Sequence, residues 1–244
     1  LAAGFVGCLI ILVSILVLIL FAAASTVPAA ACGWLAYRLG GEPAASESRR
    51  EAHGTLALDL FGRYGTLRLV GLMVVATQVV STVLDLRFSG LLEAEIDVTD
   101  QRTAYLGTFW STVNGVTFGL QFVAVPLLLR YLSLRVVHMG LPLLHLTAAA
   151  ILILYPSLAV AAAAFLLFKT VDYSVFRAAK EILYMPLPFD ARYRAKEVID
   201  AVGYRAAKGG IATILAVGGA AVRELPGALY PGIGALASGF WLAL

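Results

Sequence analysis

The chain has 244 residues, of which 61% are hydrophobic and only 14% are charged, and its mean hydropathy is +0.90. Soluble domains carry about 25% charged residues, so this composition excludes an ordinary soluble domain and indicates a membrane protein. The formal net charge is +3, but the basic residues lie between apolar runs and form no single block, which argues against a nucleic-acid partner.

Apolar runs long enough to cross a bilayer recur along the chain. About 20 consecutive apolar residues span a membrane as a helix. On that rule we predict seven spans, over residues 5–36, 67–88, 104–128, 133–155, 157–177, 198–220 and 227–244. The first is longer than the apolar region of a signal peptide, and we expect Pro28 to kink it or to leave its end at the interface. The chain starts without Met and is still apolar at Leu244, so we expect it to be part of a longer protein.

One long polar segment separates the first predicted span from the other six. Its Gly, Pro, Ser and charged residues are typical of a linker between two membrane bundles. We therefore expect residues 1–38 to be the last helix of an N-terminal half, residues 39–66 to be a cytoplasmic linker, and residues 67–244 to be a C-terminal six-helix transmembrane bundle. The missing N-terminal six-helix half is then an expected partner, and the lipid bilayer is another.

The loops between the predicted spans alternate in charge. Most of the 18 Lys and Arg residues lie in residues 38–68, 129–137 and 177–197, whereas the loop over residues 88–103 is mainly acidic. Basic loops face the cytoplasm in multi-pass proteins. The pattern therefore predicts a multi-pass protein with these three segments in the cytoplasm, which we expect in the inner membrane of a bacterium.

Charges follow an uncharged apolar run in KTVDYSVFRAAKEILYMPLP, residues 169–188. On a regular α-helix they share about half of the circumference, and Lys169 and Asp172 have the i,i+3 spacing of an ion pair. An unpaired charge at membrane depth costs several kcal/mol, so these two are expected to need each other, water or a ligand. A purely structural ion pair is the alternative. Arg177 and Lys180 either extend the site or mark the cytoplasmic end of the span.

The next predicted span begins RAKEVIDAVGYRAAKGG, residues 194–210. On a regular helix Asp200, Tyr204 and Lys208 share one face. Arg205 lies at the margin of that face. A lysine this far into a membrane helix either extends to the surface or faces a wet cavity, and we expect the cavity.

Uncharged polar residues form stripes on two further spans. Such stripes often only bond neighbouring helices, but several of them together indicate a shared aqueous path. The stripes consist of Gln78, Ser81, Thr82 and Asp85 on one span and of Ser111, Asn114 and Gln121 on the other.

Enzymatic and metal chemistry find no support in the sequence. There is no GxxxxGK[ST] phosphate loop, and no Ser/His/Asp or Cys/His set suggests a catalytic nucleophile. His138 and His145 are two helical turns apart, about 10 Å of rise, so the pair cannot share one metal ion. We therefore expect no enzyme, no metal site and no cofactor.

The two quoted stretches resemble the ATP/ADP translocase family of plastids and obligate intracellular bacteria, and its relatives in free-living bacteria. The resemblance rests on the order of charges over residues 169–210, and the helical pattern over residues 67–220 agrees with it. It implies a major-facilitator-type helix bundle of twelve helices, of which this chain covers the sixth onward. It also implies exchange of ATP for ADP, or nucleotide uptake, by alternating access between two six-helix halves.

The resemblance further implies which residues bind the substrate. Lys208 falls on the family's lysine in the penultimate helix, and Asp85 falls near its acidic residue in the seventh helix. Basic side chains in a low-dielectric cavity bind phosphate groups well, while nearby acids keep them charged. The expected substrate-binding residues are Lys169, Asp172, Arg177, Lys180, Lys208, Arg205 and Asp85.

Two alternatives stay open on the sequence alone. The first is a carrier of the same fold that moves another solute together with protons, with Asp85 or Asp172 as the coupling acid. The second is a membrane scaffold or receptor that transports nothing, in which the intramembrane charges are structural ion pairs.

Overall fold

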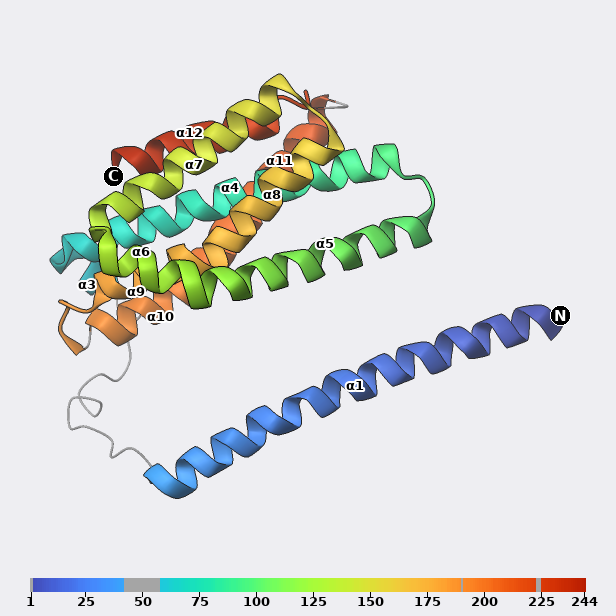
Figure 1. The fold of residues 1–244 in the computed structure, drawn as a ribbon. Helices are drawn as coiled ribbons and strands as arrows, with labels where there is room; N and C mark the ends of the chain where they lie inside the picture. The colour runs from blue at the N-terminus through green and yellow to red at the C-terminus, as the bar shows by residue number, and fades with distance from the viewer. Residues whose placement is uncertain (1, 42–57, 190, 223–224) are drawn as a thin grey trace. The chain divides into compact units, whose positions relative to one another are not determined.

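The computed structural model describes residues 2–41, 58–189, 191–222 and 225–244, and every regular element in these ranges is a helix (Figure 1). The predicted all-α integral membrane bundle is therefore confirmed. The chain divides into two compact units, Leu1–Thr55 and Leu56–Leu244. The predicted domain boundaries stay a prediction.

The first unit contains one long helix, α1 (Ala2–Gly40). It continues through Pro28 without interruption, so Pro28 does not end it. Gly41 ends the helix with a φ of 70°, a left-handed conformation that favours glycine, and its N–H donates to the carbonyl of Tyr37 at 3.0 Å. Most of the predicted linker 39–66 lies outside the described residues, but its last part forms a short helix and is not all coil.

The second unit is a bundle of antiparallel helical spans, three of which contain π-helical turns. In chain order its elements are α3 (Leu58–Arg63), α4 (Gly65–Glu95), α5 (Thr99–Gly119), η1 (Leu120–Ala124), α6 (Val125–Tyr131), α7 (Leu134–Leu154), α8 (Leu158–Val171), η2 (Asp172–Phe176), α9 (Arg177–Tyr184), η3 (Ala191–Ala195), α10 (Lys196–Val198), η4 (Ile199–Gly203), α11 (Tyr204–Val222) and α12 (Leu229–Ala243).

Within the described residues, five helical runs are long and apolar enough to cross a membrane: Ile19–Gly40, Gly65–Glu95, Thr99–Tyr131, Leu134–Leu154 and Leu158–Tyr184. Each overlaps one of the first five predicted spans, the first of them only in part. The two remaining predicted spans correspond to α11 and to α12, a shorter apolar helix.

The basic connections of the second unit lie together. Figure 1 shows α3, α6, α9 and α10 at one end of the bundle, and the α4–α5 and α7–α8 connections at the other. Ser133 and Ser157 cap the helices that follow them, with N–H donors of Val136 and Val160 at 3.4 Å from their Oγ atoms. Placement at one end is what a common cytoplasmic side requires, and the orientation itself stays a prediction.

Helix α4 is the centre of the second unit, because α8, α11 and α12 all pack against it. One part of the core is an aromatic group that joins α4, α5 and α8. In it, the Phe109 ring stacks on Phe88 at 4.7 Å and on Phe165 at 5.6 Å between centroids. The other part joins α4, α7, α9 and α12 around Phe176 and Trp241, whose rings are 5.1 Å apart.

The π-helical turns change which residues share a face. A π-helical turn contains about one residue more than an α-helical turn, so the helix beyond it is rotated by roughly 100°. The prediction for residues 169–188 assumed an unbroken α-helix, and η2 makes that assumption wrong after Val171. The same holds for residues 194–210, where η4 precedes Tyr204.

Candidate functional site

Polar and charged side chains from three parts of the second unit gather along α4. They come from α4 itself, from the α8–η2–α9 span, and from η4 with the start of α11. We call them the interior charge cluster: Ser81, Asp85, Lys169, Asp172, Tyr173, Arg177, Lys180, Asp200, Tyr204 and Lys208. Hydrogen bonds, ion pairs and electrostatic interactions connect them.

Lys169 is directed across the bundle to α4. It is only 7% exposed, and its Nζ donates to Ser81 Oγ at 3.0 Å. The rings of Phe165 and Tyr173 lie 5.3 Å from Nζ and add cation–π contacts. A buried ammonium with these neighbours is held in place without a carboxylate in contact.

The alternative of a purely structural ion pair between Lys169 and Asp172 finds no support among the described residues. The ion pairs formed by the described residues do not include it, although Asp172 acts electrostatically on Lys169. Asp172 is buried at the start of η2, and its Oδ1 has no hydrogen-bond partner among the described residues. The lysine bonds Ser81 on the neighbouring helix instead, which leaves the acid with an unpaired oxygen.

Asp85 of α4 and Lys208 of α11 form the second contact of the cluster. Lys208 Nζ lies 3.8 Å from Asp85 Oδ2. The side chain of Asp85 is 38% exposed and that of Lys208 is 52% exposed. Asp85 also acts electrostatically on Lys169, so the two lysines share this acid. Charges exposed within a span are costly against lipid, so this side of the bundle faces water or another part of the protein.

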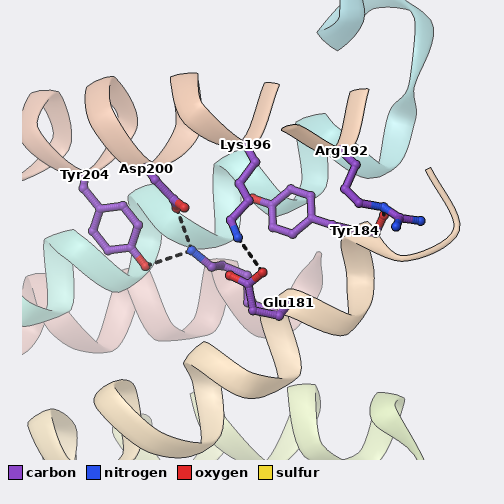
Figure 2. Close-up of polar contacts among 7 residues, drawn as sticks. Glu181, Tyr184, Arg192, Lys196, Asp200 and Tyr204 are labelled. Atoms are coloured by element: carbon purple, nitrogen blue, oxygen red, sulfur yellow. Dashed lines mark hydrogen bonds and ion pairs between the residues drawn. The ribbon is translucent and has the colours of Figure 1, made fainter. Parts of the chain in front are cut away.

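Lys180 of α9 is the most buried charge of the cluster. It is 3% exposed, and its Nζ donates to Asp200 Oδ1 at 2.7 Å and to the Tyr204 hydroxyl at 3.3 Å. Figure 2 shows Asp200 and Tyr204 reaching from one helix toward this amine. Beside it, Lys196 donates to Glu181 Oε2 at 2.6 Å on a more exposed part of the same two helices.

Arg192 binds backbone carbonyls in the connection after α9. Its guanidinium donates to the carbonyl oxygens of Tyr184 at 3.2 Å and Leu187 at 3.4 Å, and also to that of Met185. Figure 2 shows Arg192 beside Tyr184. These carbonyls belong to the end of a helix and the turn after it, where backbone acceptors lack intrahelical partners. Arg192 therefore has a structural role at the end of the bundle.

The remaining predicted residues are exposed. Arg177 is exposed at the start of α9 and acts electrostatically on Asp172 and Tyr204. Arg205 is exposed near the start of α11. The structure thus brings six of the predicted residues into one cluster, with Arg205 on the adjoining surface of α11.

Two cavities of the second unit lie away from the centre of the cluster. One of about 470 Å³ is lined mainly by apolar residues of α4, α7 and α12, including Val70, Met73 and Trp241. Another of about 340 Å³ lies at the end of the bundle beside Glu181 and Lys196. The cluster itself is buried at Lys169, Asp172 and Lys180 and partly exposed at Asp85 and Lys208. Among the described residues, no group of three or more His, Cys, Asp and Glu side chains could hold a metal ion.

The polar stripe predicted on residues 104–128 does not join the cluster. Ser111, Asn114 and Gln121 are exposed, whereas Ser81 of the other stripe is buried against Lys169. The contact between Lys180 and Asp200 was not predicted. Asp200 and Tyr204 have the i,i+4 spacing that places two side chains on one turn, and this spacing was the available signal for a shared partner.

Comparison with known proteins supports the resemblance read from the charges. Residues 122–217 match the family model described as TLC ATP/ADP transporter. The match includes Lys169, Lys180 and Lys208 and excludes Asp85. No curated protein and no solved structure matches the chain. Over residues 122–217 the chain is therefore similar to the TLC ATP/ADP transporter family, whose members are membrane transporters of nucleotides and not enzymes.

Proposed function

We propose that the protein exchanges ATP for ADP across a bacterial inner membrane by alternating access. The transported nucleotide binds at the interior charge cluster, on the side where Asp85 and Lys208 are exposed. A preceding six-helix half, with the major-facilitator arrangement, supplies the opposite wall of the substrate cavity. Transporters of this type bind their substrate near the interface of the two halves.

The observation that supports this proposal best is the exposed pair of Asp85 and Lys208 within the membrane spans. Their charged atoms are 3.8 Å apart, which is a loose contact for an ion pair. A nucleotide phosphate can therefore take the place of the carboxylate on Lys208, and the carboxylate can take it back when the nucleotide leaves.

The proposed binding residues divide by their exposure. Arg177, Arg205 and Lys208 are exposed and can contact phosphate oxygens directly. Lys169 is buried and adds positive potential behind Asp85. Asp85 and Asp172 offset these charges in the empty carrier, so that anions are not held too tightly to be released.

Counter-exchange in liposomes tests the proposal. The full-length protein, loaded with internal ADP, is expected to take up labelled ATP, and Lys208→Gln is expected to lower the rate by at least about tenfold, the effect of about 1.4 kcal/mol. Arg130→Gln removes a positive charge from the exposed side of α6 and serves as the matched control. A wild-type protein that exchanges no nucleotide would contradict the proposal and would favour a scaffold.

A proton-coupled carrier is the second candidate, because the buried Asp172 has an oxygen without a partner among the described residues. Liposomes without internal nucleotide, given only a pH gradient, separate the two. Exchange predicts no accumulation under these conditions and slower exchange in Asp172→Asn. Accumulation that follows the pH gradient and disappears in Asp172→Asn would instead establish proton coupling.

A further inference from the structure

A long polar side chain links helix α9 to the start of α11. Among the described elements, the backbone of α9 packs closely on η2, α4 and α7. Its polar contacts with η4 and α11 include those of Lys180, which reaches Asp200 and Tyr204. Figure 2 shows these side chains bridging the space between the two helices.

The three side chains satisfy each other. Lys180 is almost fully buried, donates to a carboxylate and a phenol, and lies 5.0 Å from the centroid of the Tyr204 ring. A buried ammonium is tolerated only when it is paired and hydrogen-bonded, and removal of one partner leaves an uncompensated charge. An amine held in this way is not free to bind a phosphate group in the conformation described.

The neighbouring ion pair agrees with the register that the contact of Lys180 with Asp200 sets, although as an exposed pair it contributes little energy itself. Lys180 and Glu181 are adjacent on α9. Lys180 is paired with Asp200 and Glu181 with Lys196, and these two partners lie four residues apart on the next helix. A slip of one helical turn would bring Lys180 toward Lys196. Like charges would then face each other, so only one register satisfies both pairs.

We infer that Lys180, Asp200 and Tyr204 form a brace that fixes the start of α11 against α9 and thereby places Lys208 opposite Asp85. Lys208 follows Tyr204 by four residues, about 6 Å of helical rise, on nearly the same face. Lys180 and Asp200 are thus positioning residues, and Lys180 is not a phosphate ligand. This inference rests on the proposed nucleotide exchange.

A charge swap separates a brace from a phosphate ligand. Lys180→Asp and Asp200→Lys each place like charges together, and each is expected to raise the KM for ATP by at least about tenfold, or about 1.4 kcal/mol. The double variant restores the pair with its polarity reversed, so its KM is expected to return to within about threefold of wild type. If Lys180 binds phosphate, the double variant stays as impaired as Lys180→Asp alone, and the inference is overturned.

Two further variants serve as controls. Lys196→Gln removes a lysine from the exposed neighbouring ion pair and is expected to leave the KM within about twofold of wild type, because exposed pairs contribute little. Tyr204→Phe keeps the ring but removes the hydroxyl that accepts from Lys180. It is expected to raise the KM by about threefold to tenfold, in proportion to one hydrogen bond.

A cross-link tests the brace without altering it. Glu181→Cys and Lys196→Cys, in a background with Cys8→Ala and Cys32→Ala, can be joined by a bifunctional thiol reagent. A brace that stays closed during transport predicts that the cross-linked protein still exchanges ATP for ADP. Arrest of exchange after cross-linking would show that the two helices separate, and would overturn the inference.

Failure of the inference is distinguishable from failure of the proposed function. If the wild-type protein exchanges no nucleotide, the proposed function fails. The brace is then judged by thermal unfolding of the purified variants. It predicts lower unfolding temperatures for both single charge changes and recovery in the double variant, and a double variant without recovery overturns it.

Discussion

At the scale of single residues, the main feature is a difference between two lysines that the sequence presents as equivalent. Lys169 is buried and bonded to Ser81, whereas Lys208 is half-exposed and only loosely paired with Asp85. Burial of an ammonium is costly unless its hydrogen bonds are satisfied, and exposure within a span is costly unless water is present. The two lysines therefore indicate that the bundle has an interior in which charges are hydrogen-bonded and a face that is in contact with water.

The bond from Lys169 to Ser81 can be tested through stability. Ser81→Ala leaves a buried ammonium without this acceptor, so we expect a loss of about 1–3 kcal/mol in the free energy of unfolding. Ser238→Ala is the matched control, because Ser238 is also buried but its hydroxyl has no partner among the described residues. Unfolding in detergent should show a clear loss for Ser81→Ala only. Equal losses in both variants would contradict the contact.

At the scale of elements, the helices are held together by side-chain packing. Within a bilayer the hydrophobic effect between helices is weak, and close contact supplies the attraction. The stacked rings of Phe88, Phe109 and Phe165 provide such contact between α4, α5 and α8. The π-helical turns η1 and η2, which follow α5 and α8 in the chain, also contact each other.

The aromatic contact of α5 gives a prediction at this scale. Phe109→Ala removes the central ring, and we expect a loss of at least about 1 kcal/mol in the free energy of unfolding, below the 3–5 kcal/mol typical of water-soluble cores. Phe118→Ala on the same helix is the control, because Phe118 is 67% exposed and can remain in contact with lipid. Thermal unfolding of both variants in lipid nanodiscs measures the difference. A larger loss for Phe118→Ala would contradict the packing described.

The elements also show what could be predicted from the sequence. The spans were predictable because their length and apolar composition are local properties of the chain. The π-helical turns were not, since they depend on packing, and they rotate the residues after Val171 away from the predicted face. The pairing of Lys180 with Asp200 was missed for a similar reason. It joins two helices, and an apolar pattern does not specify which side chains meet across them.

At the scale of the whole second unit, exposure differs between polar and apolar sides. Arg177 and Lys208 are exposed and Asp85 is partly exposed around α4, α9 and α11, whereas Ile214 and Val217 are exposed on another face of α11. The charged side requires water or a second bundle, and the apolar side suits lipid. A carrier made of two halves would place the charged side at their interface, which is the arrangement that we propose.

The most direct test of this account is the reactivity of single cysteines on α11 toward a charged, membrane-impermeant thiol reagent. Ala212→Cys lies one turn beyond Lys208, and Ile214→Cys lies on the apolar side, where the native side chain is 67% exposed. In a background without Cys8 and Cys32, the account predicts that the cysteine at position 212 reacts, that ATP and ADP slow its reaction, and that the one at position 214 does not react. Equal reactivity at the two positions, or a reaction at position 212 that nucleotide leaves unchanged, would contradict a water-filled nucleotide site at the charge cluster.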